Sequence, residues 1–157
     1  EGPAELEKIR KAVKLALNAP SACNKQPVKV HLISSPHSVK QLLNLQQGNR
    51  GFGHLIEQVL LITVDIRSYG RYEDRFNPYI DGGLFSMNLL YALHYYKIAS
   101  IPLVWIDSKQ RNEELHNIVD FPNEEYPCLL IGIGEPAKEF LTTASQRNVI
   151  DDVLTEH

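Results

Sequence analysis

The stretch that most constrains the fold is an uncharged run, Gly82 to Tyr96, which reads GGLFSMNLLYALHYY. It contains no Asp, Glu, Lys or Arg, so much of its surface has to be removed from water. A membrane span needs about 20 apolar residues, and this run is shorter and is interrupted by Ser86, Asn88 and His94. We therefore predict a buried helix from Tyr79 to about Tyr96.

Hydrophobic periodicity predicts the other elements. Apolar residues at three- and four-residue spacing indicate helices, which we place at Ala4–Leu17, at Pro36 to about Gly48 and at Lys109–Val119. Alternating or β-branched runs indicate strands, which we place at Val28–Ile33, Ile56–Ile66, Ile101–Trp105 and Cys128–Pro136. Asp107 is the expected N-cap of the last helix, because Gln110 follows three residues later as in a capping box.

The order of these elements decides the fold class. A doubly wound sheet would alternate strands and helices regularly, whereas here the long helices are unevenly spaced and the strands are few. We therefore predict a single α+β domain over residues 1–157, with a central mixed or antiparallel sheet flanked by helices. The polar stretch Arg67–Pro78 is expected to be a surface excursion, and the polar tail from Ala144 to lie on a surface or against a partner.

Charge and cysteine content exclude several functional classes. With 16 Lys and Arg against 19 Asp and Glu, the net charge of -3 gives no reason to expect binding to nucleic acid or to an anionic membrane. Cys23 and Cys128 lie far apart, so neither a disulfide framework nor a zinc site is indicated. Glu1 to Arg10 lacks the apolar core of a signal peptide, and we expect a cytoplasmic protein.

The usual catalytic motifs are missing from the sequence. It contains no GxGxxG, GxxxxGK[ST], HExxH or GxSxG pattern, and its histidines are scattered without the spacing of metal ligands. Cys23 would act as a nucleophile only with a base beside it, and the sequence indicates none. We therefore assign no catalytic side chain and no metal site.

A loop bounded by two prolines is the least ordinary segment. In NAPSACNKQPVKVHLI, residues 18–33, a predicted helix stops before Pro20 and a predicted strand begins after Pro27. Such a turn leaves backbone groups without ladder partners, and its short polar side chains add hydrogen-bond donors and acceptors at little volume. The segment is suited to binding a ligand, but it can equally be a connection whose Ser and Asn satisfy their own turn.

Four segments resemble one known family when taken together. They are APSACNKQP at residues 19–27, DGGLFSMNLLYAL at 81–93, IASIPLVW at 98–105, and FPNEEYPCLLIGIGEP at 121–136 followed by SQRNVIDDVL at 145–154. In order and spacing they are similar to the nitroreductase superfamily of flavin proteins, with its APSxxNxQP loop, its helix carrying an Asn in a DxGxxxxN-like context and its IPxxYxPxxLIxIGxP segment. The resemblance covers residues 4 to 154 and implies a nitroreductase-like fold.

The resemblance also implies a cofactor and its contacts. Family members bind FMN in a groove at a homodimer interface. The residues that would contact it here are Pro20, Ser21, Ala22 and Asn24 in the loop, and Ser100, Ile101, Pro102, Leu103 and Val104 beside the reactive edge of the flavin. Arg147 aligns with the residue that binds the FMN phosphate, which an Arg fork can grip bidentately. The alternative for the loop is an ordinary turn, for residues 100–104 a buried edge strand, and for Arg147 a solvated surface arginine.

Two departures from the family pattern stand out. Family members usually carry Gly-Leu-Gly where this chain has Lys97, Ile98 and Ala99, which is expected to alter a close backbone approach. An RRSxR-like segment that supplies further phosphate ligands usually precedes the first helix, and no such segment is recognised here. We expect an N-terminally shortened domain in which either FMN affinity is reduced or other cations compensate, the candidates being Arg50, Arg71 and Arg75.

The function that the resemblance implies is an FMN-dependent oxidoreductase. It would act as a homodimer in a ping-pong cycle, with hydride passing from NAD(P)H through FMN to a nitroaromatic, a quinone or a similar acceptor. No side chain need act as an obligatory acid or base, because the flavin carries the chemistry. The alternative is a non-catalytic dimeric member of the fold, flavin-binding or flavin-free, with a ligand-binding or regulatory role.

Overall fold

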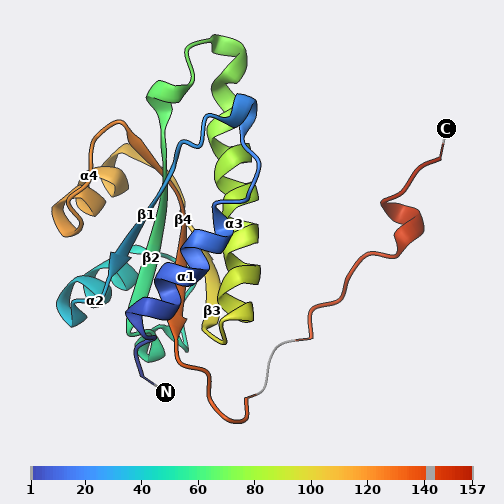
Figure 1. The fold of residues 1–157 in the computed structure, drawn as a ribbon. Coiled ribbons are helices and arrows are strands. Elements are labelled where there is room, and N and C mark those ends of the chain that lie inside the picture. Colours follow the sequence, from blue (N-terminus) through green and yellow to red (C-terminus); the bar gives the residue numbers. More distant parts are fainter. Residues whose placement is uncertain (1, 141–143, 157) are drawn as a thin grey trace.

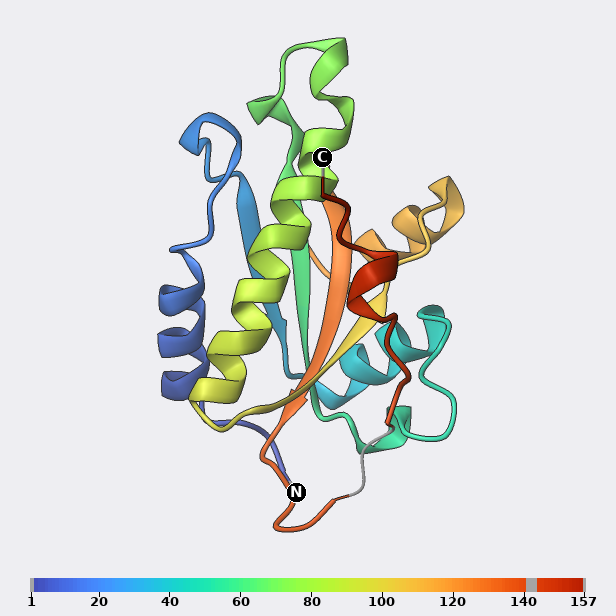
Figure 2. The same cartoon turned by 90° about the vertical axis from the view of Figure 1, so that its right-hand side faces the viewer.

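The computed structural model describes residues 2–140 and 144–156. These residues form three layers, with a β-sheet between two pairs of helices (Figure 1). One face of the sheet is covered by α1 (Leu6–Ala16) and α3 (Asn77–Tyr95), and the other by α2 (Pro36–Leu45) and α4 (Lys109–Ile118), as Figure 2 also shows. The predicted α+β class is confirmed.

The sheet in the described part of the chain has four strands in the order β1-β2-β4-β3, and neighbouring strands are antiparallel throughout. Their bounds are Val28–Ile33 for β1, Gln58–Asp65 for β2, Ala99–Val104 for β3 and Glu125–Gly134 for β4. All four predicted strands are confirmed, and β1 has its predicted bounds. β4 begins three residues earlier than predicted because Glu125 pairs with Asp65 at the end of β2.

The central position of β2, with helices over both faces of the sheet, explains its apolar run. Leu60 and Ile62 pack into the core beneath α1 and α3, whereas Val59 and Leu61 pack into the core beneath α2 and α4. Because successive strand side chains point to opposite faces, a strand covered on both faces is apolar at most positions. The sheet therefore separates two hydrophobic cores.

Helix α3 lies against the sheet, and the two approach each other closely at Gly82. A Cβ added at Gly82 would lie 2.9 Å from the Sγ of Cys128 on β4 and 3.2 Å from a methyl group of Val64 on β2. Only a residue without a side chain fits such a contact. Burial at this contact raises the pKa of the Cys128 thiol to about 12, so the group stays protonated.

The predicted helix at 79–96 exists, but only one side of it is buried. Phe85, Leu89 and Leu93 are at most 5% exposed and belong to the core, as expected. The opposite side carries large apolar side chains that are each at least 45% exposed, namely Ile80, Leu84, Met87, Tyr91 and Tyr95. The helix is therefore only partly buried, which differs from the predicted buried helix, because the sheet and α1 cover one side of it. None of the helices formed by residues 2–140 and 144–156 combines the length and hydrophobicity that crossing a bilayer requires.

The predicted end of α2 near Gly48 was wrong. The helix ends at Leu45, because the backbone of Gln46 is extended and its side chain turns inward, where it is only 4% exposed. The Gln46 Nε2 donates to the carbonyl oxygen of Val104 at 3.0 Å, which ties the end of α2 to β3. A contact across the fold therefore decides where this helix stops.

The predicted cap of α4 was also wrong, by one residue. Ser108 is the N-cap, and its Oγ accepts a hydrogen bond of 3.3 Å from the backbone N–H of Arg111. Asp107 instead accepts from the Tyr126 hydroxyl and, at 2.8 Å, from Asn112 Nδ2. The carboxylate is used to connect α4 to β4 rather than to start the helix.

The excursion between β2 and α3 is confirmed and consists of two short 3-10 turns, Ile66–Ser68 and Tyr72–Phe76. The Arg75 guanidinium lies over the rings of Tyr72 and Phe76, 4.5 and 4.4 Å from their centroids, and both rings are exposed. At the base of the excursion, hydrogen bonds from Arg67 hold the pKa of the Asp65 carboxyl below its usual value.

The C-terminal segment runs away from the three layers (Figure 1). All of residues 144–156 are exposed, and among them are four large apolar side chains, Val149, Ile150, Val153 and Leu154. The predicted surface placement of this tail is consistent with its exposure.

A buried polar network joins the three strands β1, β2 and β4. The carboxylate of Glu125, 8% exposed, accepts hydrogen bonds of 2.6 Å from the Thr63 hydroxyl and 2.7 Å from the ring of His31. The His31 ring also contacts Phe121, with 5.5 Å between ring centroids. A single buried carboxylate therefore satisfies two donors from neighbouring strands.

Replacing this carboxylate tests its contribution to stability. We expect Glu125→Ala to lower the free energy of unfolding by about 2 to 3 kcal/mol, because it removes the carboxylate that accepts from the buried Thr63 hydroxyl and from the half-buried His31 ring. Glu113→Ala, which removes an exposed carboxylate on α4, should change it by less than about 0.5 kcal/mol. Urea unfolding followed by circular dichroism measures both variants, and equal midpoints would contradict the expectation.

Candidate functional site

The loop predicted as a binding element has an unusual backbone. Between Pro20 and Pro27 it forms a 3-10 turn at Ala22–Asn24, in which Cys23 and Asn24 have φ values of 49° and 55°. Gln26 follows with φ 50°. Left-handed backbone is uncommon for residues other than glycine and is retained only where surrounding contacts impose it.

Hydrogen bonds to the loop supply those contacts. The Ser21 Oγ accepts from the backbone N–H of Gln26 at 2.9 Å, and the Asn24 Oδ1 accepts from the Gln26 side chain at 3.1 Å. The backbone N–H of Ala22 donates to both carboxylate oxygens of Asp81, at 3.0 and 3.1 Å. Ser21 and Asn24 thus take part in their own turn, while Asn24 stays exposed and Ser21 half-buried.

This loop does not enclose a ligand-sized space within one chain. The cavity beside it, lined by Pro20, Ser21 and neighbouring residues, measures about 30 Å³. Cofactor pockets usually measure about 300 to 1,000 Å³. A flavin at this loop would need a second wall from elsewhere.

The second predicted element, residues 100–104, belongs to the edge strand β3. Pro102 has no N–H, so it fits an edge strand only where its nitrogen faces away from β4. The backbone groups of Ser100 and Val104, two residues on either side, then face the open edge as well. The carbonyl of Val104 agrees with this, since it accepts a hydrogen bond from the side chain of Gln46.

The side chains of β3 differ in what they can contact. Leu103 is 4% exposed and packs in the core beneath α2 and α4, so its side chain is unavailable to a ligand. Ser100 and Ile101 line a cavity of about 250 Å³ that runs beside Gly132 and Gly134 of β4. The edge of β3 offers backbone donors and a shallow wall rather than an enclosed pocket.

The structure does not bring the predicted site residues together within one chain. The loop leads into β1 at one edge of the sheet, whereas β3 forms the opposite edge. Arg147 lies in the extended tail, where its guanidinium donates to the carbonyls of Ser145 and Gln146, at 3.2 and 3.5 Å. The three predicted groups therefore occupy three separate places.

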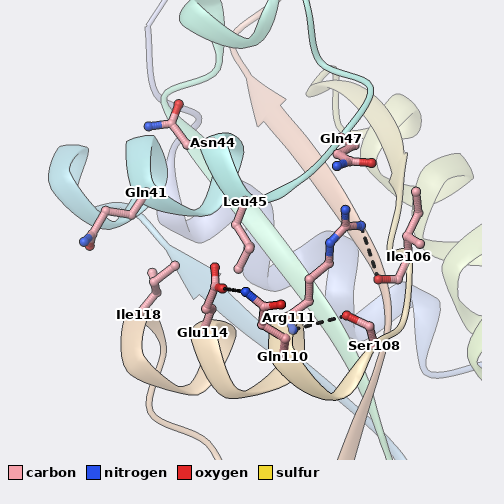
Figure 3. Close-up of a pocket in the computed structure, with 10 residues that line it drawn as sticks. All are labelled: Gln41, Asn44, Leu45, Gln47, Ile106, Ser108, Gln110, Arg111, Glu114 and Ile118. Atoms are coloured by element: carbon pink, nitrogen blue, oxygen red, sulfur yellow. Dashed lines mark hydrogen bonds between the residues drawn. The ribbon is translucent and has the colours of Figure 1, made fainter.

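A polar cavity of about 740 Å³ lies between α2 and α4 and contains none of the predicted residues (Figure 3). Its lining includes Gln41, Asn44 and Leu45 of α2 and Gln110, Arg111 and Glu114 of α4. In the described part of the chain, no group of three His, Cys, Asp or Glu side chains is placed to hold a metal ion.

Sequence reasoning missed the contacts that hold the predicted loop. Asp81 was part of the DGGLFSMN segment but was given no role, and Tyr69 was placed only in a surface excursion. The signal that could have found Asp81 is a carboxylate in an uncharged helix directly before Gly82, since a buried acid needs specific donors.

The turn where the sequence departs from Gly-Leu-Gly keeps a left-handed residue. Lys97 has φ 59°, and its N–H donates to the carbonyl of His94 at 3.0 Å. The N–H of Ile98 donates to Leu93 at 2.9 Å, which closes the end of α3 as glycine usually does. The altered residues therefore leave the turn itself in place.

Comparison with known proteins agrees with this fold. Residues 3–49, which include α1, the loop and β1, match the model of the Nitroreductase family. A search of curated protein sequences finds no significant match.

Solved structures extend the similarity to the whole chain. A nitroreductase family protein from Streptococcus pneumoniae has a TM-score of 0.80 at 20% identity, covering 100% of this chain and 92% of its own. A protein assigned as an NAD(P)H:FMN oxidoreductase from Staphylococcus epidermidis has a TM-score of 0.81 at 19% identity, covering 98% and 86%. A protein assigned as a nitroreductase from Desulfovibrio desulfuricans, solved in complex with FMN, has a TM-score of 0.80 at 19% identity, covering 100% and 87%.

These findings define the fold of the chain. The chain has the nitroreductase-like fold, and the resemblance of its sequence to that family is confirmed.

Substitutions at Cys23 test the strained backbone of the loop. At an ordinary position Gly would be less stable than Val by about 1 kcal/mol, because glycine has more conformational freedom to lose on folding. At φ 49° a β-branched side chain is strained, so we expect the order to reverse, with Cys23→Val less stable than Cys23→Gly by about 1 to 2 kcal/mol. Urea unfolding of the two variants measures this, and a more stable Val variant would mean that the residue is not left-handed.

Proposed function

We propose that this protein is an FMN-dependent oxidoreductase of the nitroreductase type, using NAD(P)H as reductant and a nitroaromatic, quinone or similar acceptor. The observation that carries the proposal is the loop at 20–24, because it lies within the matched family segment and has a fixed, solvent-accessible, polar turn. The FMN in the Desulfovibrio desulfuricans structure supports the choice of cofactor.

The chemistry of the available groups fits a flavin. In the loop, Ser21 and Asn24 offer a hydroxyl and an amide for the polar parts of the cofactor, at little volume. Backbone N–H groups of Ser100 and Val104 at the open edge of β3 can donate to a ring that gains negative charge. Arg147 would grip the phosphate, which suits its planar fork of donors.

Bound FMN would supply the redox chemistry, taking hydride from NAD(P)H and passing it to the acceptor in a ping-pong cycle. The protein's own part would be to bind the flavin, to orient it and to stabilise the charge that develops on it. The N–H dipoles at the β3 edge are fixed by the sheet, so they need no reorganisation when charge develops beside them. No side chain has to act as an acid or base in this scheme.

We propose that the working form is a homodimer. The loop and β3 lie at opposite edges of one sheet, so a second copy is needed to bring such groups to one cofactor. A suitable surface exists on α3, where exposed apolar side chains recur every three or four residues and form one stripe, Ile80, Leu84, Met87, Tyr91 and Tyr95. The apolar side chains of the extended tail would cover further surface on a partner.

Flavin binding tests the proposal directly. We expect the purified protein to take up FMN, giving flavin absorbance bands, and to oxidise NADH or NADPH when a quinone or nitroaromatic is added. Arg147→Ala should weaken FMN binding by about tenfold or more, because it removes a charge-assisted bond to the phosphate. Lys109→Ala, which removes an exposed cation on α4, is the matched control and should leave the affinity unchanged.

Two outcomes would contradict this function. A protein that neither takes up FMN nor oxidises NAD(P)H is not a flavin oxidoreductase. Tight FMN binding without turnover over a broad panel of acceptors would favour the non-catalytic alternative.

Charge placed on the α3 stripe tests the dimer. We expect the wild-type protein to have twice the mass of one chain in size-exclusion chromatography with light scattering. The double variant Met87→Glu and Tyr91→Glu should be monomeric at the same concentration, because burying two carboxylates in an apolar interface is strongly unfavourable. The control variant His37→Glu changes an exposed residue of α2, which covers the opposite face of the sheet, and it should stay dimeric. A wild-type monomer would contradict the homodimer.

A further inference from the structure

A buried carboxyl group near the start of α3 has partners that no motif explains. Asp81 is 3% exposed, and it accepts from the backbone N–H of Ala22 and, at 2.6 Å, from the hydroxyl of Tyr69. Among the residues that the structure describes, no Lys, Arg or His lies within 4.0 Å of this carboxyl group. It is held by hydrogen-bond donors from two other segments of the chain.

The donor from the loop lies at its most strained point. Ala22 stands directly before Cys23 and Asn24, the two successive residues with positive φ. Residues with positive φ relax to other backbone conformations unless surrounding contacts prevent the change. The turn therefore needs a contact with another part of the fold to hold it. The Ser21 and Asn24 bonds within the loop constrain its far end at Gln26, whereas Asp81 is the group that fixes Ala22 to the rest of the fold.

The donor from the excursion adds a second connection. Tyr69 donates to Asp81, and the Nζ of Lys25 lies 4.8 Å from the centroid of its ring. Lys25 also pairs with Asp74 of the excursion, at 3.9 Å. Burial and the bond to Asp81 both raise the pKa of the Tyr69 hydroxyl, so it remains protonated and able to donate.

The position of Asp81 itself is fixed by the packing of the next residue. Gly82 lies against Cys128 and Val64, so the first turns of α3 cannot move away from the sheet without opening a gap. The carboxyl group is thus presented to the loop from a rigid element. A functional group positioned by helix and sheet is held more accurately than one positioned by a loop alone.

We propose that Asp81, with Tyr69 as its second partner, is the positioning residue of the flavin loop, holding Ser21 and Asn24 in the geometry that binds FMN. Asp81 does not touch the cofactor, and it acts through the backbone N–H of Ala22. The claim that Asp81 supports FMN binding rests on the proposed function, whereas the claim that Asp81 holds the loop does not.

Amide hydrogen exchange in the flavin-free protein tests the structural part. Asp81→Asn keeps the size of the side chain but has one acceptor oxygen in place of two, and Tyr69→Phe removes the second donor. We expect Asp81→Asn to speed amide exchange in a peptide covering residues 19–27 by roughly 10- to 100-fold, because one amide oxygen replaces the two oxygens that accept from Ala22 and Tyr69. Tyr69→Phe should give a smaller increase.

The matched control is Ser86→Ala on the same helix. Ser86 is 4% exposed, and its hydroxyl has no hydrogen-bond partner, in the loop or elsewhere, among residues 2–140 and 144–156. Its removal should therefore leave exchange in residues 19–27 unchanged. Equal exchange in Asp81→Asn and Ser86→Ala would overturn the inference. Thermal unfolding of each variant distinguishes a local loosening of the loop from a loss of the whole fold.

FMN titration tests the functional part on the same variants. We expect the FMN dissociation constant, from quenching of flavin fluorescence, to rise about tenfold or more in Asp81→Asn and to stay at the wild-type value in Ser86→Ala. Faster exchange with unchanged FMN affinity would overturn the positioning role. A wild-type protein that binds no FMN would overturn the proposed function, and the exchange result would then still decide whether Asp81 anchors the loop.

Discussion

The contact of α3 with the sheet at Gly82 is the constraint on which the rest of the structure depends. A residue without a side chain lets the helix approach Val64 and Cys128 closely. This approach buries one side of α3, presents Asp81 to the loop before β1, and turns the other side of the helix to solvent. The close approach at Gly82 therefore affects which side of α3 joins the core, where Asp81 meets the loop and which side chains form the exposed stripe.

The same arrangement explains why the proposed FMN site would need a second copy of the chain. A four-stranded sheet has two edges, and here the segments suited to FMN lie at both, with β1 at one and β3 at the other. The exposed side of α3 and the apolar residues of the tail remain without cover in a single copy. In the proposed homodimer, the association that buries these surfaces would also bring the loop and β3 to one cofactor, so assembly and function would depend on the same contacts.

Local patterns predicted much of the fold correctly. The β1 strand has its predicted bounds and β2 is found within its predicted segment, because alternation and β-branched density are properties of neighbouring residues. Errors occurred where a distant partner competes for a side chain. Gln46 ends α2 because it bonds to Val104, and Asp107 fails to cap α4 because it bonds to Tyr126. Neither partner is near in sequence.

The sequence by itself determined the α+β class, the core strands, the uncharged helix and the position of the loop between its two prolines, since each depends on residues close together in the chain. Tertiary structure alone decided that Cys23 and Asn24 have left-handed backbone, that Asp81 accepts from the loop at Ala22, and which side of α3 stays exposed. The physical reason is that strain and burial depend on contacts between segments that are far apart along the chain. Residues 22 and 81 meet only because the helix packs closely on the sheet at Gly82.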